Sequence, residues 1–232
     1  MLTCLLCEGA VPFELSLPYL LTGRLRLSDR LCPDCWAAFE RVDSNACPNC
    51  GRQMGRATLC SDCRLWQERG QGTLSNQALY QYNDQMKDYM ARYKFIGDYR
   101  LRQIFQKEMK AAIRKRMKDD QVNAIVPIPL IQERLDQRGF NQVRPFLPND
   151  CPIINALAVR PGKHRDQSSR TRFERLAAKQ PFVLKEEARQ AIAFKRVLIV
   201  DDVYTTGRTL YHAANCLLAA GASAVFSQTL AR

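Results

Sequence analysis

Two adjacent acids and a threonine-rich loop follow an apolar run near the end of the chain. The segment Val197–Leu210 has the sequence VLIVDDVYTTGRTL, with Asp201 and Asp202 directly after four apolar residues. The loop amides and the start of a following helix would present N–H groups to a phosphate. The acids would repel that phosphate, and therefore suit sugar hydroxyls or a Mg²⁺ ion. A phosphate beside vicinal hydroxyls describes a ribose 5-phosphate, so the segment predicts a ribose-phosphate site.

Most residues expected to bind this ligand come from the loop itself. Gly207 allows close approach of the backbone to an anion, and three threonines add hydroxyl donors. The predicted binding residues of the segment are Asp201, Asp202, Thr205, Thr206, Gly207, Arg208 and Thr209. The chain contains neither a Walker A loop nor a GxGxxG motif, which argues against ATP hydrolysis and nicotinamide chemistry.

Eight cysteines form four CxxC pairs within residues 1–66. The pairs are Cys4/Cys7, Cys32/Cys35, Cys47/Cys50 and Cys60/Cys63. One CxxC pair places two thiolates on a tight turn, and two pairs complete a tetrahedral zinc site. We predict two structural Zn²⁺ ions, since four thiolates leave no open coordination position for catalysis. Sequential pairing of the motifs is the simplest arrangement, and an interleaved pairing also fits the spacing.

The net charge of +12 is unevenly distributed over the 232 residues. Residues 1–66 hold seven basic and seven acidic side chains, so the whole surplus lies in residues 67–232. This surplus favours a polyanionic partner, either nucleic acid or a phosphorylated small molecule; a basic surface without a specific ligand is the alternative. The 46% of apolar residues indicates a globular protein. With no secretory signal and no apolar run that could span a bilayer, we expect a cytoplasmic protein.

Between Lys87 and Lys118 the chain carries eleven basic residues against three acidic ones. Asp98 is expected to cap a helix whose apolar residues recur at helical spacing. The opposite helix face would carry a basic stripe, for which we predict single-stranded DNA contacts through Lys107, Lys110, Arg114, Lys115 and Lys118. Tyr89, Tyr93 and Phe95 lie near this run and would add stacking on bases. The alternative is a solvated helix face with these aromatic residues in the core.

Apolar strands that alternate with helices must position these residues. The expected strands are Ala78–Tyr82, Asn123–Leu130, Ile153–Arg160, Arg196–Val203 and Ala224–Thr229, and the expected final helix is Thr209–Ala220. This alternation implies a parallel sheet covered on both faces. Such sheets bind ligands at the carboxyl ends of their strands, where Asp201 and Asp202 stand.

The segment Val197–Leu210 resembles the signature of the phosphoribosyltransferases, with four apolar residues, two acids and a Thr-Gly-rich loop. Beyond this segment, nearly the whole chain is similar to the ComF family, and within it to the ComFC-type competence proteins. The likeness also rests on the CxxC pairs, on Met86–Leu101 (MKDYMARYKFIGDYRL), on VPIPL at Val126–Leu130, on RGFNQ at Arg138–Gln142 and on the arginine-rich stretch around Gln167 and Arg175.

The resemblance implies an α/β fold in which a small Cys4 zinc-ribbon domain precedes a type I phosphoribosyltransferase-like parallel-sheet domain. We expect a double zinc-ribbon domain at residues 1–66, a linker or arm at 67–83 and the phosphoribosyltransferase-like domain at 84–232. The family likeness further implies that the acids bind the ribose hydroxyls of phosphoribosyl pyrophosphate (PRPP), together with Mg²⁺, and that the loop binds its 5-phosphate. Lys163 and Arg165 would neutralise the pyrophosphate or bind a DNA backbone, and Arg138 would lie near the pyrophosphate.

A role in natural transformation is also implied by the resemblance. There the protein would work with a ComFA-type helicase, contacted through the zinc domain, and be recruited by its partners to the inner face of the membrane as single-stranded DNA enters. Purine salvage enzymes of the family have an aspartate where Thr205 stands, and threonine cannot serve as a general base at neutral pH. We therefore favour an accessory protein that binds single-stranded DNA and keeps a ribose-phosphate pocket. The alternatives are an active phosphoribosyltransferase with an unknown acceptor and a scaffold with a vestigial pocket.

Overall fold

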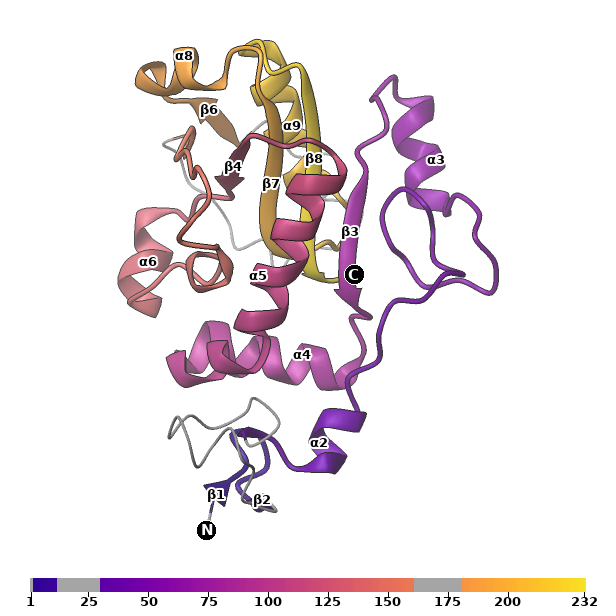
Figure 1. The fold of residues 1–232 in the computed structure, drawn as a ribbon, viewed down its shortest axis with the longest axis vertical. Coiled ribbons are helices and arrows are strands. Elements are labelled where there is room, and N and C mark those ends of the chain that lie inside the picture. The colour runs from indigo at the N-terminus through magenta and orange to yellow at the C-terminus, as the bar shows by residue number, and fades with distance from the viewer. Residues whose placement is uncertain (1, 12–29, 161–180) are drawn as a thin grey trace.

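A four-stranded parallel sheet forms the centre of the molecule (Figure 1). The computed structural model describes residues 2–11, 30–160 and 181–232. In spatial order the strands are β3 (Asn76–Tyr80), β8 (Ala224–Ala231), β7 (Arg196–Val203) and β4 (Ala124–Pro127). The predicted α/β fold with a parallel sheet is confirmed.

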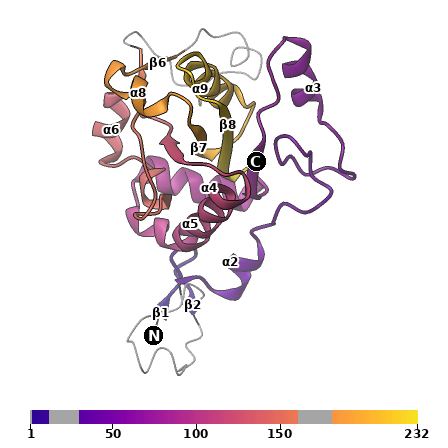
Figure 2. The same ribbon diagram turned by 45° about the horizontal axis from the view of Figure 1, so that its top comes forward.

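The side chains of β7 alternate between two hydrophobic cores, one on each face of the sheet. Leu198 and Val200 pack into the core that contains helix α5 (Arg102–Asp119), whereas Val197 and Ile199 pack into the core that contains helix α9 (Arg208–Ala219). This division follows from the two-residue period of a strand. Figures 1 and 2 show α5 and α9 on opposite sides of the sheet. An uninterrupted apolar run such as VLIV therefore belongs to a strand that is buried on both faces.

Three expected strands and the final helix occur where the sequence places them, as β4, β7, β8 and α9. The segment Ile153–Arg160 differs from the expectation. Only Leu157–Val159 forms a strand, β5, and it pairs antiparallel with β6 (Phe182–Leu184) outside the main sheet. Earlier in the segment, Ile153 makes a single parallel bridge to Ile125. Asn155 is exposed and accepts a hydrogen bond from Arg144, which interrupts the apolar run between these two pairings.

The segment 67–83, expected as a linker or arm, contains the edge strand β3. This strand runs parallel to β8, with Asn76 opposite Ser227. The buried Asn76 amide donates hydrogen bonds to the Thr229 hydroxyl at 3.2 Å and to the Cys50 carbonyl at 3.1 Å. One asparagine thus joins the sheet to a cysteine-rich segment.

Shorter elements surround the sheet. They are β1 (Leu2–Thr3), β2 (Ala10–Val11), α2 (Pro33–Ala37), α3 (Ser61–Glu68), α4 (Asp84–Ala91), the π-helix η2 (Arg92–Ile96), α6 (Gln132–Arg138), α8 (Arg189–Ile192) and the 3₁₀ helices η3 (Tyr99–Leu101), η4 (Arg144–Phe146) and η6 (Glu186–Ala188). Asp98 accepts a hydrogen bond from the Arg100 amide and so caps η3, which leads directly into α5.

Among the helices of the described ranges, none is both long and apolar enough to cross a membrane.

The tyrosines expected beside the basic stripe belong to the core. Tyr89 and Tyr93 are fully buried, and both rings stack on each other with centroids 5.7 Å apart. Phe105 of α5 meets Tyr89 edge-to-face at 4.9 Å. The interpretation that these two tyrosines stack on bases is therefore wrong, because no face of either ring is open to a ligand.

Candidate functional site

Strand β7 delivers two buried carboxylates to the carboxyl edge of the sheet. Asp201 is 7% exposed and Asp202 is 4% exposed. The Asp202 backbone N–H donates to the Asp201 carboxylate at 2.9 Å. Burial, together with the charge of Asp202, raises the pKa of Asp201 to about 8, although Lys94 and that hydrogen bond oppose the shift. A pair of this kind strongly favours a ligand that brings hydroxyl donors or positive charge.

Lys94 lies against this acid pair, although it was not among the residues predicted for the site. Its Nζ atom is 2.8 Å from Oδ1 of Asp202. The lysine belongs to the π-helix η2, which ends at Gly97 with a φ of +75°. Oδ2 of Asp202 is buried and has no hydrogen-bond partner among the residues described. This oxygen can therefore accept a hydrogen bond from a ligand hydroxyl.

The loop after β7 turns sharply at Gly207 and opens into α9. Gly207 has a φ of +79°, and a Cβ atom there would lie 2.1 Å from the hydroxyl of Tyr204. Only glycine fits this turn without displacing Tyr204. The N-cap residue of α9 is Gly207, and among the described residues no side chain caps this helix, so its first N–H groups can bind an anion. Thr206 is buried in the loop and Thr205 is exposed.

Of the four predicted basic ligand-binding residues, the structure describes two, and the side chains of both contact other residues of the protein. Arg208 is buried, and its Nε atom donates to Nε2 of His212 at 2.8 Å. Arg138 ends α6 and donates to the side chain of Gln142 at 3.0 Å. Lys163 and Arg165 lie outside the described residues.

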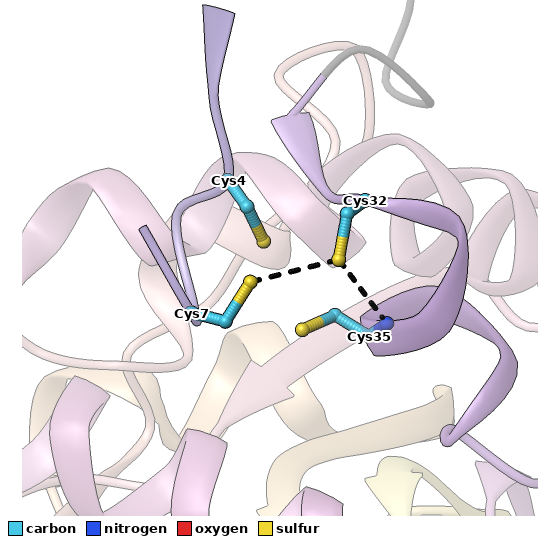
Figure 3. Close-up of side chains that lie close together, drawn as sticks. All are labelled: Cys4, Cys7, Cys32 and Cys35. Carbon is cyan, nitrogen blue, oxygen red and sulfur yellow. Dashed lines mark hydrogen bonds between the residues drawn. The ribbon is translucent and has the colours of Figure 1, made fainter. Parts of the chain in front are cut away.

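The eight CxxC cysteines form two separate clusters. Cys4, Cys7, Cys32 and Cys35 make the first, shown in Figure 3, and Cys47, Cys50, Cys60 and Cys63 make the second. Within each cluster the sulfur atoms lie within 4.8 Å of one another. The motifs are therefore paired sequentially, and the interleaved arrangement does not occur.

The sulfur positions fit tetrahedral zinc. Zn–S bonds of 2.3 Å put thiolates about 3.8 Å apart on the edges of a tetrahedron. The sulfurs of Cys7 and Cys32 are 3.6 Å apart in the first cluster. In the second cluster, the Cys47–Cys63 and Cys50–Cys60 pairs are separated by 3.7 Å and 3.6 Å. Both clusters are thus shaped for a structural ion with four thiolate ligands.

The second cysteine cluster is joined directly to the loop that follows β7. Trp66 of α3 donates from its indole Nε1 to the Thr206 carbonyl at 2.9 Å, and its ring stacks on Tyr211 of α9 with centroids 4.5 Å apart. Arg232 donates to the Thr205 carbonyl at 2.7 Å and to the Cys50 sulfur at 3.3 Å. A cysteine-rich segment and the predicted phosphate loop are thus one connected unit, which neither motif indicates by itself.

The basic stripe lies on the solvent side of α5. Lys107, Lys110 and Lys118 form no ion pair with other described residues, and Lys107 and Lys118 are exposed. Arg114 pairs with Asp150 at 2.7 Å, and Lys115 pairs with Asp119 one helical turn away. The two paired cations have less free charge to offer a phosphate than the three lysines.

Known proteins share both halves of this architecture. A family model described as a double zinc ribbon domain matches residues 22–64, and one described as a phosphoribosyl transferase domain matches residues 154–232. Competence protein ComFC of Streptococcus pneumoniae is 38% identical over 231 residues, which cover 99% of each chain. Competence protein ComFC of Bacillus subtilis is 32% identical over 240 residues, covering 100% of this chain and 95% of that protein. Competence protein F of Haemophilus influenzae is 24% identical over 224 residues, covering 87% and 96%.

Proposed function

Since the chain belongs to the ComFC family of competence proteins, we propose that it acts in natural transformation as a single-stranded DNA-binding protein with a ribose 5-phosphate pocket. The residues at the end of β7 are the observation that supports the proposed pocket. There the Asp202 oxygen that lacks a described partner belongs to the strand that leads through the loop into α9, whose start no described side chain caps. Hydroxyl groups and a phosphate on one ligand would satisfy both features at once.

Phosphoribosyl pyrophosphate carries the hydroxyl and phosphate groups that this pocket would bind. Its ribose hydroxyls would donate to Asp201 and Asp202, and its 5-phosphate would accept from the loop and the first turn of α9. Lys94 neutralises one of the two acids and so lowers the repulsion that a polyanionic ligand would meet. Mg²⁺, when bound, would supply positive charge to the pyrophosphate.

Two structural zinc ions would hold the cysteine-rich segments in place. In the second cluster the ion would also fix the loop indirectly, because Trp66 and Arg232 bridge from that cluster to the Thr205 and Thr206 carbonyls. At the first cluster, Trp36 presents an exposed ring beside Cys35. We assign the contact with a ComFA-type helicase to this first cluster.

Single-stranded DNA would meet the basic stripe of α5 through its phosphates. Fluorescence anisotropy with a labelled oligothymidylate tests this directly. Reversing three charges, with Lys107→Glu, Lys110→Glu and Lys118→Glu together, should weaken binding and reduce the slope of log affinity against log salt by about 2. Arg56→Glu, Arg64→Glu and Arg69→Glu together reverse three exposed charges away from α5; this matched control should have a smaller effect. Equal affinity of the triple variant and the unmodified protein at low salt would remove the stripe from the proposal.

A further inference from the structure

A cavity of about 510 Å³ opens next to the strand that carries the acid pair. Its walls come from the loop after β4, from α6 and from the start of β5. Ile128 of that loop donates its N–H to the Val200 carbonyl at 3.0 Å, one residue before Asp201. The cavity is large enough for a heteroaromatic ring. Neither the acids nor the loop after β7 is among the described residues that line it.

An aromatic pair forms part of the cavity wall. The rings of Tyr99 and Phe140 meet with centroids 4.8 Å apart and planes tilted by 55°. Tyr99 is 42% exposed, unlike the buried Tyr89 and Tyr93. Leu135 and Leu157 add apolar surface. The Arg102 guanidinium covers one face of the Tyr99 ring, so a flat ligand that enters here would stack on the part of this side chain that remains accessible beside Phe140.

Positive charge surrounds this aromatic pair. The guanidinium carbon of Arg102 lies 3.8 Å from the centre of the Tyr99 ring. Arg144 and Lys185 also line the cavity, and no acidic side chain is among the described residues of its wall. Arg144 donates to the Asn155 side chain at 3.0 Å, which places an amide at the cavity for hydrogen bonding. Exposed aromatic residues next to cations are what proteins use to bind single-stranded nucleic acids.

We propose that this cavity takes one base of a single-stranded nucleic acid, which stacks on Tyr99 while the adjoining phosphates lie against Arg102, Arg144 and Lys185. The inference rests on the single-stranded DNA binding proposed above and names the residues that meet a base. Arg102 is the first residue of α5, the helix that also carries the basic stripe. Tyr99 thus takes the base-stacking role that the sequence predicts for Tyr89 and Tyr93.

Matched tyrosine variants and a matched oligonucleotide test this inference. Tyr99→Leu should weaken the binding of a short oligothymidylate by about tenfold, the usual effect of losing one base–aromatic stack. Tyr99→Trp should retain the affinity, because the indole ring also stacks. Tyr82→Leu is the control, since Tyr82 is 41% exposed and does not line the cavity. With the unmodified protein, an abasic strand of the same length should bind as weakly as the oligothymidylate binds to Tyr99→Leu, which tests the base contact without any substitution.

Each alternative outcome has a definite meaning. If the protein binds the oligothymidylate and the abasic strand equally well, no base is recognised and this inference fails, while DNA binding through phosphates stands. If the protein binds neither strand, the proposed DNA-binding function fails as well. If thymidine 5′-monophosphate displaces the strand at the same nucleotide concentration, and Tyr99→Leu abolishes that displacement, the cavity belongs to a free nucleotide and the inference is overturned.

Discussion

Arg232 connects the second cysteine cluster to the loop after β7, and replacing it should break this polar connection. Its guanidinium is 6% exposed and contacts both structures. It donates to the Thr205 carbonyl at 2.7 Å, and it pairs with Asp62 at 3.3 Å. Arg232→Met keeps most of the apolar stem and removes every one of these polar contacts. The variant therefore isolates the polar connection from the packing.

The size of the effect follows from the contacts that are lost. A hydrogen bond that involves a charged group contributes about 1.5–3 kcal/mol. Asp62 keeps its second partner, Arg52, and is not left without a counter-charge. The expected loss is therefore near the cost of one to two such bonds, about 3 kcal/mol. In a chain of this length, that corresponds to a fall in melting temperature of about 6–12 °C.

Thermal unfolding followed by circular dichroism measures this loss. Arg232→Lys should fall between the two proteins, because lysine keeps the charge and lacks the planar fork of donors. Arg189→Met is the control: its partner Glu186 is exposed, and such surface pairs contribute about 0–1 kcal/mol. If Arg232→Met melts at the same temperature as the unmodified protein, the polar connection between the cluster and the loop does not contribute to stability and our reasoning is refuted.

Three further predictions concern single positions of the site. Gly207→Ala should destabilise the protein by about 2–5 kcal/mol in chemical denaturation, because it combines a positive φ with a Cβ atom 2.1 Å from the Tyr204 hydroxyl. The control is Gly139→Ala, where φ is +74° and no atom lies near the added Cβ; it should cost only about 1–2 kcal/mol. Burial raises the pKa of Asp201 to about 8 in the folded protein, so the folded state keeps a proton that the unfolded chain releases near pH 4. The free energy of unfolding should therefore fall as the pH rises from about 4 to about 8. Asp201→Asn should flatten that pH dependence in melting curves. Cys60→Ser should lower the zinc content measured by atomic emission from about two ions per chain to about one; an unchanged content of two ions would show that Cys60 is not needed to hold the zinc of the second cluster.

Local patterns in the sequence predict several elements correctly. The β-branched run before Asp201 predicts β7, because only a strand buried on both faces needs four consecutive apolar residues. The CxxC spacing predicts four-cysteine clusters, because each motif places two sulfur atoms on one turn. Both inferences use residues that are close together in the chain.

Contacts between distant segments could not be predicted in this way. Lys94 and Asp202 are 108 positions apart, and no local pattern assigns a lysine from a basic run to an acid on another element. Trp66 reaches the Thr206 carbonyl across 140 positions. The similarity of Met86–Leu101 to the family was the one sign that Lys94 has a role. The buried tyrosines were misplaced for the same reason, because their burial depends on Phe105 and other residues of the packed core.

We propose above that the end of β7 binds a ribose 5-phosphate group. Isothermal titration calorimetry of phosphoribosyl pyrophosphate with Mg²⁺ tests it most directly. We predict saturable binding to one site per chain, and a loss of affinity of about tenfold or more in Asp202→Asn, which keeps the shape of the side chain and removes its charge. If the unmodified protein does not bind the ligand, or if Asp202→Asn binds it equally well, the end of β7 is not a ribose 5-phosphate site.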